Sequence, residues 1–196
     1  MKTPLHTPLR IGQPGDITLL LEPVDPTEIE AMQQHQIVLQ KLYGGQLMEP
    51  VHLTCQRFAL TNPQQSPALV AMLTAFAGQY KPFTLQAQGL LPFYSQYRQV
   101  HLLKWEVILD PQLVSFSAQL EQLLETPWIS KLYSPGWVST LVTALVDINP
   151  EPSKSPGQLP GLPHPLFTPG ILTISKLLEP SEFEIMEKIP LWKSSP

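Results

Sequence analysis

The sequence has few of the residues on which several large classes of protein depend. Cys55 is the only cysteine among 196 residues, which excludes an intramolecular disulfide framework and a multi-cysteine metal site. Lysine and arginine number 12 against 16 acidic residues, too few for the basic surface that binds long nucleic acids. No run of about 18 apolar residues occurs, and residues 1–13 lack the apolar stretch of a secretory signal. We therefore expect a cytoplasmic monomer with no membrane or DNA partner and no metal or other cofactor.

Apolar residues and prolines are abundant instead. Hydrophobic residues make up 43% of the chain, enough for the core of one domain spanning residues 1–196. The 23 prolines are well above ordinary usage, and many gather in residues 149–169. Proline removes a backbone donor, so this segment is predicted to be a loop insertion without helix or ladder. Such a loop is also a candidate surface for a protein partner. Residues 1–15 are interpreted as an N-terminal extension.

Hydrophobic periodicity and turn residues predict a mixed α+β chain. Asp25 and Pro26 are typical of a helix start, with Glu28 positioned to close a capping box. Alternation in the strand after this helix places His52, Thr54 and Gln56 on one face. Strands are expected over residues 17–22, 50–58, 83–90, 100–108, 138–148, 170–178 and 183–191, and helices over 25–43, 66–77 and 110–124.

The element order and the segment Pro50-Val-His-Leu-Thr54 resemble the 2H phosphoesterase superfamily, best known for 2′-5′ RNA ligases and RNA cyclic phosphodiesterases. The resemblance also covers the opening strand ending in Glu22-Pro23 and the strand start at Pro82-Phe83. It implies an α+β fold of two β-α-β lobes with antiparallel sheets around a central groove. It further implies that each lobe supplies a His-x-Thr/Ser motif, so His52 and Thr54 are the candidate catalytic residues.

The second motif is degenerate. By the resemblance it falls within Pro135-Gly-Trp-Val-Ser-Thr-Leu141, where Trp137 occupies the histidine position and Ser139 or Thr140 is left to bind phosphate. Hydrolysis of a 2′,3′-cyclic phosphate needs one group to activate water and another to protonate the departing ribose oxygen. Tryptophan cannot transfer that proton. Half of the arrangement is therefore missing.

Other side chains are candidates for the groove. His164, in residues 149–169, could replace the missing acid if the loop folds over the groove. Trp137 could stack on a base, as aromatic residues do in single-strand binders, or simply fill the core. Tyr97 and Arg98 lie in a polar bend, where they could contact a nucleotide or be exposed.

Three functions therefore remain open. The first is a degenerate relative that binds a phosphate-containing ligand (an RNA end, a cyclic phosphate or a nucleotide) with weak or no turnover. The second is an active RNA 2′,3′-cyclic phosphodiesterase with an unconventional general acid. The third is a non-catalytic protein-interaction module. The small number of cations favours a short ligand over a polynucleotide.

Overall fold

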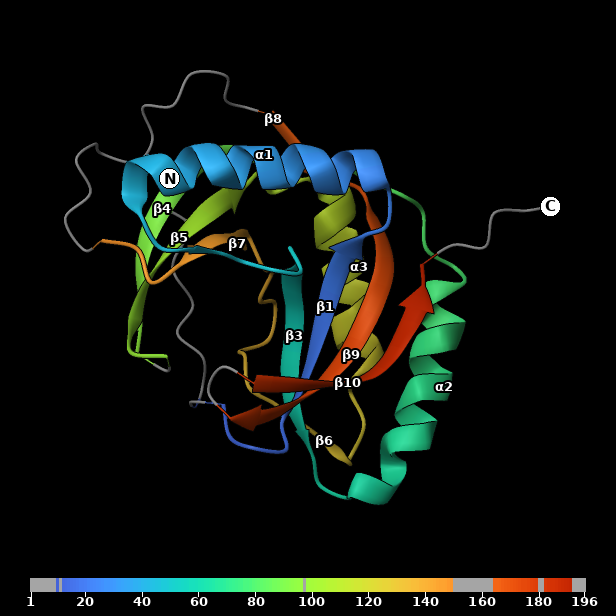
Figure 1. The fold of residues 1–196 in the computed structure, drawn as a ribbon. Helices are drawn as coiled ribbons and strands as arrows, with labels where there is room; N and C mark the ends of the chain where they lie inside the picture. Colours follow the sequence, from blue (N-terminus) through green and yellow to red (C-terminus); the bar gives the residue numbers. More distant parts are fainter. Residues whose placement is uncertain (1–9, 11, 97, 150–163, 180–181, 192–196) are drawn as a thin grey trace.

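The computed structural model describes residues 10, 12–96, 98–149, 164–179 and 182–191. Figure 1 shows a strongly twisted sheet with helices packed against it. The elements in chain order are β1 (Ile17–Pro23), α1 (Pro26–Tyr43), β2 (Gln46–Leu47), β3 (Leu53–Leu60), the short 3₁₀ helix η1 (Pro63–Gln65), α2 (Ser66–Ala77), β4 (Leu85–Ser95), β5 (Val100–Val107), α3 (Pro111–Leu123), β6 (Ile129–Lys131), β7 (Leu141–Val146), β8 (His164–Phe167), β9 (Pro169–Glu179) and β10 (Glu182–Pro190).

Helix α1 begins and ends at the residues that the sequence predicts. The Asp25 side chain accepts a hydrogen bond from the Thr27 backbone N–H at 2.8 Å. Gly44 ends the helix with a φ of +69°, a conformation that residues with a Cβ rarely adopt. The predicted capping box is wrong, because Glu28 Oε2 instead accepts from the Thr168 backbone N–H at 3.0 Å. Glu28 therefore ties α1 to the chain between β8 and β9.

The strands form one sheet in the order β10-β9-β1-β3-β7-β5-β4-β8, and every pairing in it is antiparallel. β2 adds to β7, and β6 adds to β3. The two halves of the sheet meet between β3 and β7, where Leu53 and Val142 form the only residue pair of that ladder. Each half contains the two strands of one of the predicted β-α-β units. This arrangement confirms the predicted bilobal α+β fold.

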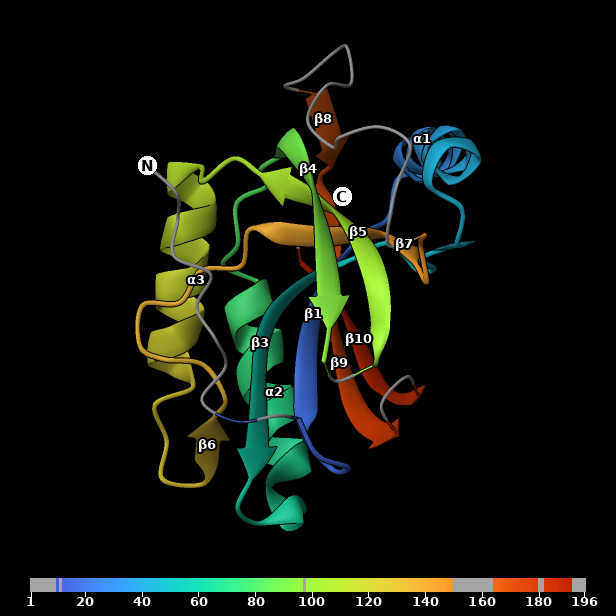
Figure 2. The same ribbon diagram turned by 90° about the vertical axis from the view of Figure 1, so that its left-hand side faces the viewer.

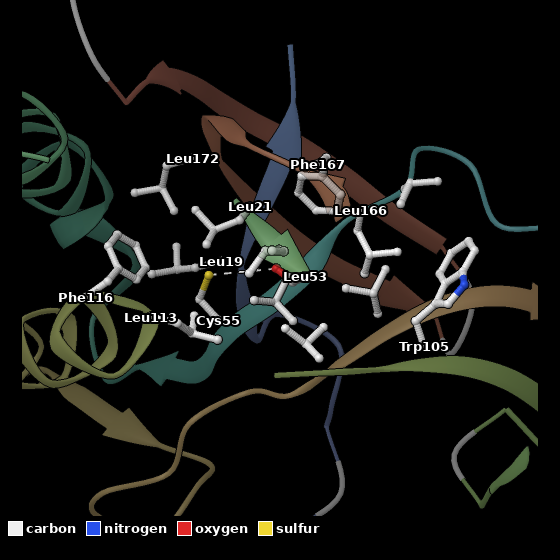
Figure 3. Packing of buried hydrophobic residues seen from close by; sticks show 14 of the residues in the cluster. Leu19, Leu21, Leu53, Cys55, Trp105, Leu113, Phe116, Leu166, Phe167 and Leu172 are labelled. Carbon is white, nitrogen blue, oxygen red and sulfur yellow. Dashed lines mark hydrogen bonds between the residues drawn. The ribbon is translucent and has the colours of Figure 1, made fainter. Parts of the chain in front are cut away.

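One face of the sheet is apolar and packs against the helices. Helices α2 and α3 cover the half that contains β1 and β3, with α2 in contact with β10, whereas α1 lies over β7 and β8 (Figures 1 and 2). Figure 3 shows how Leu19, Leu21 and Leu53 meet Phe116 of α3 in this core, with the Cys55 thiol among them. The opposite face of the sheet carries the polar side chains described below. We call it the polar face.

The proline-rich segment differs in part from the prediction of a loop over residues 149–169. Residues 150–163 lie outside the described part of the chain. The end of the segment, however, forms strand β8, which pairs with β4 at the end of the strand order. An edge strand tolerates Pro165 because its outer side needs no donors. Periodicity could not reveal a strand this short.

Candidate functional site

A β-bulge in β3 decides which of its side chains reach the polar face. Leu20 of β1 pairs with Thr54, but Leu19 pairs with Gln56, so Cys55 is the extra residue. Gln56 is consequently buried on the helix side, and the predicted uninterrupted alternation is wrong beyond Thr54. The bulge brings Arg57, which had been placed on the opposite side, to the face that carries Thr54.

Arg57 is held in place on the polar face by a neighbour on β1. It pairs with Thr18, and its Nε donates to Thr18 Oγ1 at 3.0 Å. This bond uses one of the five guanidinium donors. Among the described residues, no carboxylate lies within 4.0 Å of the Arg57 guanidinium. The remaining donors are suited to an anion.

His52 directly precedes β3 and is half-buried. Its Nδ1 lies 2.8 Å from the Pro50 carbonyl oxygen. A carbonyl can only accept, so this contact assigns the proton to Nδ1 and leaves the lone pair on Nε2. Burial is the main cause that lowers the pKa of His52; the nearby cations Arg98 and Lys104 lower it further, while the Pro50 bond and Glu22 oppose the shift. The imidazole is therefore neutral at pH 7, with Nε2 able to accept a proton.

The residue pair Leu53–Val142 also identifies the counterpart of His52 in the other half of the sheet. Two antiparallel strands are related by a local twofold axis through a paired position, so residues preceding Leu53 and Val142 correspond. His52 therefore corresponds to Leu141, and Thr54 corresponds to Thr143. Thr143, which follows Val142, lies on the same face of the sheet as Thr54. The sequence alone did not identify Leu141 or Thr143 as site residues, because their place depends on the register between β3 and β7.

The predicted second motif lies before this position. Ser139 is buried, and the Thr140 carbonyl accepts from the Val107 backbone N–H at 2.7 Å, both upstream of β7. The Trp137 ring stacks on the Tyr133 ring, with centroids 3.8 Å apart and planes 9° from parallel. The register thus puts Leu141, rather than Trp137, at the position related to His52. Both alignments leave the second histidine absent.

Lys104 of β5 is the second cation of the polar face. It pairs with Thr143, the residue after Val142, which places it on the polar face. Its Nζ lies 4.4 Å from the centroid of the Phe93 ring. Burial, followed by the charges of Arg98 and Arg57, lowers the pKa of Lys104 to about 8. In the described ranges it has no carboxylate partner within 4.0 Å.

Arg98 and Tyr97 are the two candidates that the sequence places in the polar bend. The backbone N–H of Arg98, in the turn between β4 and β5, donates to Ser95 Oγ at 3.1 Å, and its charge acts on both His52 and Lys104. Arg98 therefore contributes to the positive potential of the polar face. Tyr97 lies outside the described residues.

His164 is not brought to this face. It begins β8, which is four strand spacings from β3 in the sheet order, or about 19 Å at the usual separation. Its ring packs edge-to-face on His35 of α1, with centroids 4.9 Å apart. The expectation that His164 could replace the second histidine is not supported by this placement, because the loop end joins the sheet edge instead of covering the polar face.

Neither a metal cluster nor a membrane helix is found in the described parts of the chain. They contain no group of three or more His, Cys, Asp or Glu side chains placed to hold a metal ion. None of the helices described is long and apolar enough to cross a membrane.

Comparisons with solved structures identify the fold. E. coli LigT complexed with 3′-AMP superposes with a TM-score of 0.57 at 17% identity, covering 92% of this chain and 100% of LigT. TT0787 of Thermus thermophilus gives 0.56 at 15% identity, with 92% and 100% covered. Usb1 of Kluyveromyces marxianus gives 0.56 at 12% identity, with 91% and 99% covered. No family model matches the sequence, and no curated protein does. All three neighbours are 2H phosphoesterases, so the chain has the 2H phosphoesterase-like fold.

Proposed function

We propose that this protein binds a short phosphate-containing ligand, such as an RNA end, a cyclic phosphate or a nucleotide, on its polar face, with weak or no turnover. The observation that carries the proposal is the polar face where the two halves of the sheet meet: Leu53 pairs with Val142, and Thr143, the next residue of β7, pairs with Lys104. This face combines the neutral imidazole of His52, the hydroxyls of Thr54 and Thr143, and the Lys104 cation, which has no carboxylate partner among the described residues. The polar face lacks a second proton-transfer group at the position related to His52, because Leu141 stands there.

The chemistry of these side chains suits a phosphate. Thr54 and Thr143 carry hydroxyls that can donate to phosphate oxygens, and Arg57 and Lys104 supply positive charge. His52 Nε2 can accept a proton from water or from a ribose hydroxyl. Leu141 can neither donate nor accept, so the departing oxygen lacks the matching acid. General acid–base catalysis contributes typically 10²–10⁴-fold per positioned group, and that factor is lost.

The structural neighbours support a ligand of this class. LigT of E. coli has been solved with 3′-AMP, with NADP⁺ and with phosphate. These compounds share a phosphate group and are short. A short ligand also suits this chain, whose 12 basic residues would neutralise few phosphates of a polynucleotide.

The test is titration calorimetry with a nucleoside 2′,3′-cyclic phosphate. Binding should be abolished or weakened at least about tenfold by His52→Ala and by Thr54→Val, since each removes a group that contacts the phosphate. His101→Ala is the matched control, because His101 is a half-buried strand histidine that packs on Tyr94 instead. Equal affinity in all four proteins would overturn the proposal.

One observation favours a second candidate, an active cyclic phosphodiesterase with Lys104 as the unconventional acid. Lys104 lies on the polar face, where its charge acts on His52, and a pKa of about 8 suits proton donation near neutral pH. Hydrolysis of an RNA ending in a 2′,3′-cyclic phosphate would then be lost in both His52→Ala and Lys104→Met. Absence of turnover in the wild-type protein would leave binding as the function.

The third possibility is a protein-interaction module acting through residues 149–169. Most of that segment lies outside the described residues, and the polar face gives this possibility no support. This possibility predicts that the full chain captures a partner protein and that the capture requires that segment. Removal of residues 150–163 would then abolish capture without changing the titration with cyclic phosphate.

A further inference from the structure

A cavity of about 610 Å³ opens beside the proposed phosphate site, at the end of the sheet where β1 stops and β3 begins. Helix α1 and the residues that follow β1 and precede β3 form its walls. The apolar lining consists of Pro23, Val24, Ile29, Pro50, Val51 and Ile171. A mostly apolar lining with a few polar groups is typical of a small-molecule pocket.

The polar groups of the cavity are two carboxylates, one ammonium and the amide of Gln33. Glu22 is only 4% exposed; its Oε2 accepts from Lys188 Nζ at 2.7 Å, while its Oε1 is buried without a hydrogen-bond partner among the described residues. A buried unpaired carboxylate oxygen is costly, so a donor is expected there. Glu49 is the second carboxylate, and its Oε1 accepts from Gln33 Nε2 at 3.3 Å. The cavity therefore offers more acceptors than donors.

Glu22 also connects the cavity to His52. Leu21 and Leu53 form the last pair of the ladder between β1 and β3; Glu22 follows that pair and His52 precedes it, and the charge of Glu22 acts on the imidazole. Neighbouring strands are about 4.8 Å apart. A ligand with its phosphate at His52 and Thr54 would therefore reach the cavity with a group attached through one sugar.

We propose that this cavity is a base-binding pocket that selects guanine, an inference that rests on the proposed phosphate site. The Watson–Crick edge of guanine carries two adjacent donors, N1–H and the N2 amino group, followed by the acceptor O6. Glu22 Oε1 accepts from the donors, Lys188 donates to O6, and Glu49 provides a further acceptor at the rim. Adenine and cytosine offer only one donor group on this edge, and uracil offers a single N–H between two acceptors.

The experiment compares the four nucleoside 3′-monophosphates by titration calorimetry. Guanosine 3′-monophosphate should bind at least about tenfold more tightly than each of the other three. This is the discrimination expected of a good paired hydrogen-bond contact. Glu22→Gln should remove that preference, because its amide replaces one acceptor with a donor. Glu106→Gln is the matched control. Glu106 follows Trp105, the partner of Val142, just as Glu22 follows Leu21, the partner of Leu53. Unlike Glu22, Glu106 lies outside the cavity.

Guanosine and adenosine without phosphate separate this inference from the proposed function. If guanosine alone binds in a Glu22-dependent way while phosphate adds nothing, the pocket stands and the phosphate site fails. If all four nucleotides bind equally and Glu22→Gln has no effect, the pocket is overturned and the phosphate site stands. Absence of binding by every nucleotide and nucleoside overturns both, and a preference for another base overturns the guanine assignment.

Discussion

Leu53 of β3 and Val142 of β7 are the one residue pair that joins β3 to β7. Both side chains are fully buried on the helix side, so the residues flanking each of them lie on the polar face. His52 and Thr54 flank Leu53, whereas Leu141 and Thr143 flank Val142. This pair therefore joins the two halves of the fold and positions the two halves of the site.

Replacing Leu53 by alanine should destabilise the whole domain. A buried leucine replaced by alanine costs about 2–5 kcal/mol in the free energy of unfolding, and Leu53 is 0% exposed at the junction of the halves. Chemical denaturation should show this loss, while Leu109→Ala, at a residue 50% exposed, should change stability by less than about 0.5 kcal/mol. Equal small losses in both variants would mean that the two halves are held together elsewhere.

Replacing Arg57 by methionine should weaken binding of a nucleoside 2′,3′-cyclic phosphate. The change keeps an apolar stem and removes the guanidinium that the bulge brings to the polar face, so we expect a dissociation constant about tenfold higher, the usual effect of a lost charge-assisted hydrogen bond. Lys131→Met is the control, because Lys131 pairs with Glu121 and Glu125. Unchanged affinity in Arg57→Met would show that Arg57 has only a structural contact with Thr18.

Binding of the same ligand should weaken as the pH rises through the pKa of Lys104. That pKa is lowered to about 8, so Lys104 loses its charge above this pH, while His52, whose pKa is lowered, is already neutral. If the ligand requires the ammonium, the dissociation constant should rise by up to about tenfold per pH unit above pH 8. Titrations at several pH values would measure the slope. The same slope in Lys104→Met would contradict the assignment.

Much of the fold could be predicted from the sequence because its helices are periodic and because aspartates cap the starts of α1 and α3. The Asp25 cap and the Gly44 stop define α1, and His52 and Thr54 were identified before their surroundings were known. The bulge at Cys55 could not be predicted, because it depends on pairing with a strand that lies over thirty residues earlier in the chain. It exchanges the faces that uninterrupted alternation gives to Gln56 and Arg57, so alternation alone does not place Arg57 on the face of Thr54.

The counterpart of His52 was misplaced for a related reason. Spacing along the chain pointed to Trp137, whereas position on the polar face depends on the register between β3 and β7. Residues 132–140 between β6 and β7 form a longer connection than residues 48–52 between β2 and β3, so the two halves do not match residue for residue. The place of Lys104 on the polar face likewise depends on the fold, which brings β5 beside β7.

The most direct test of this account is to restore the missing histidine. Leu141→His, assayed with a short RNA ending in a 2′,3′-cyclic phosphate, should raise hydrolysis by about 10²-fold or more over the wild-type protein, because it supplies the second proton-transfer group. The gain should disappear in the double variant with His52→Ala, and Trp137→His should give no gain. A gain from Trp137→His and none from Leu141→His would show that the register places the second half of the site wrongly.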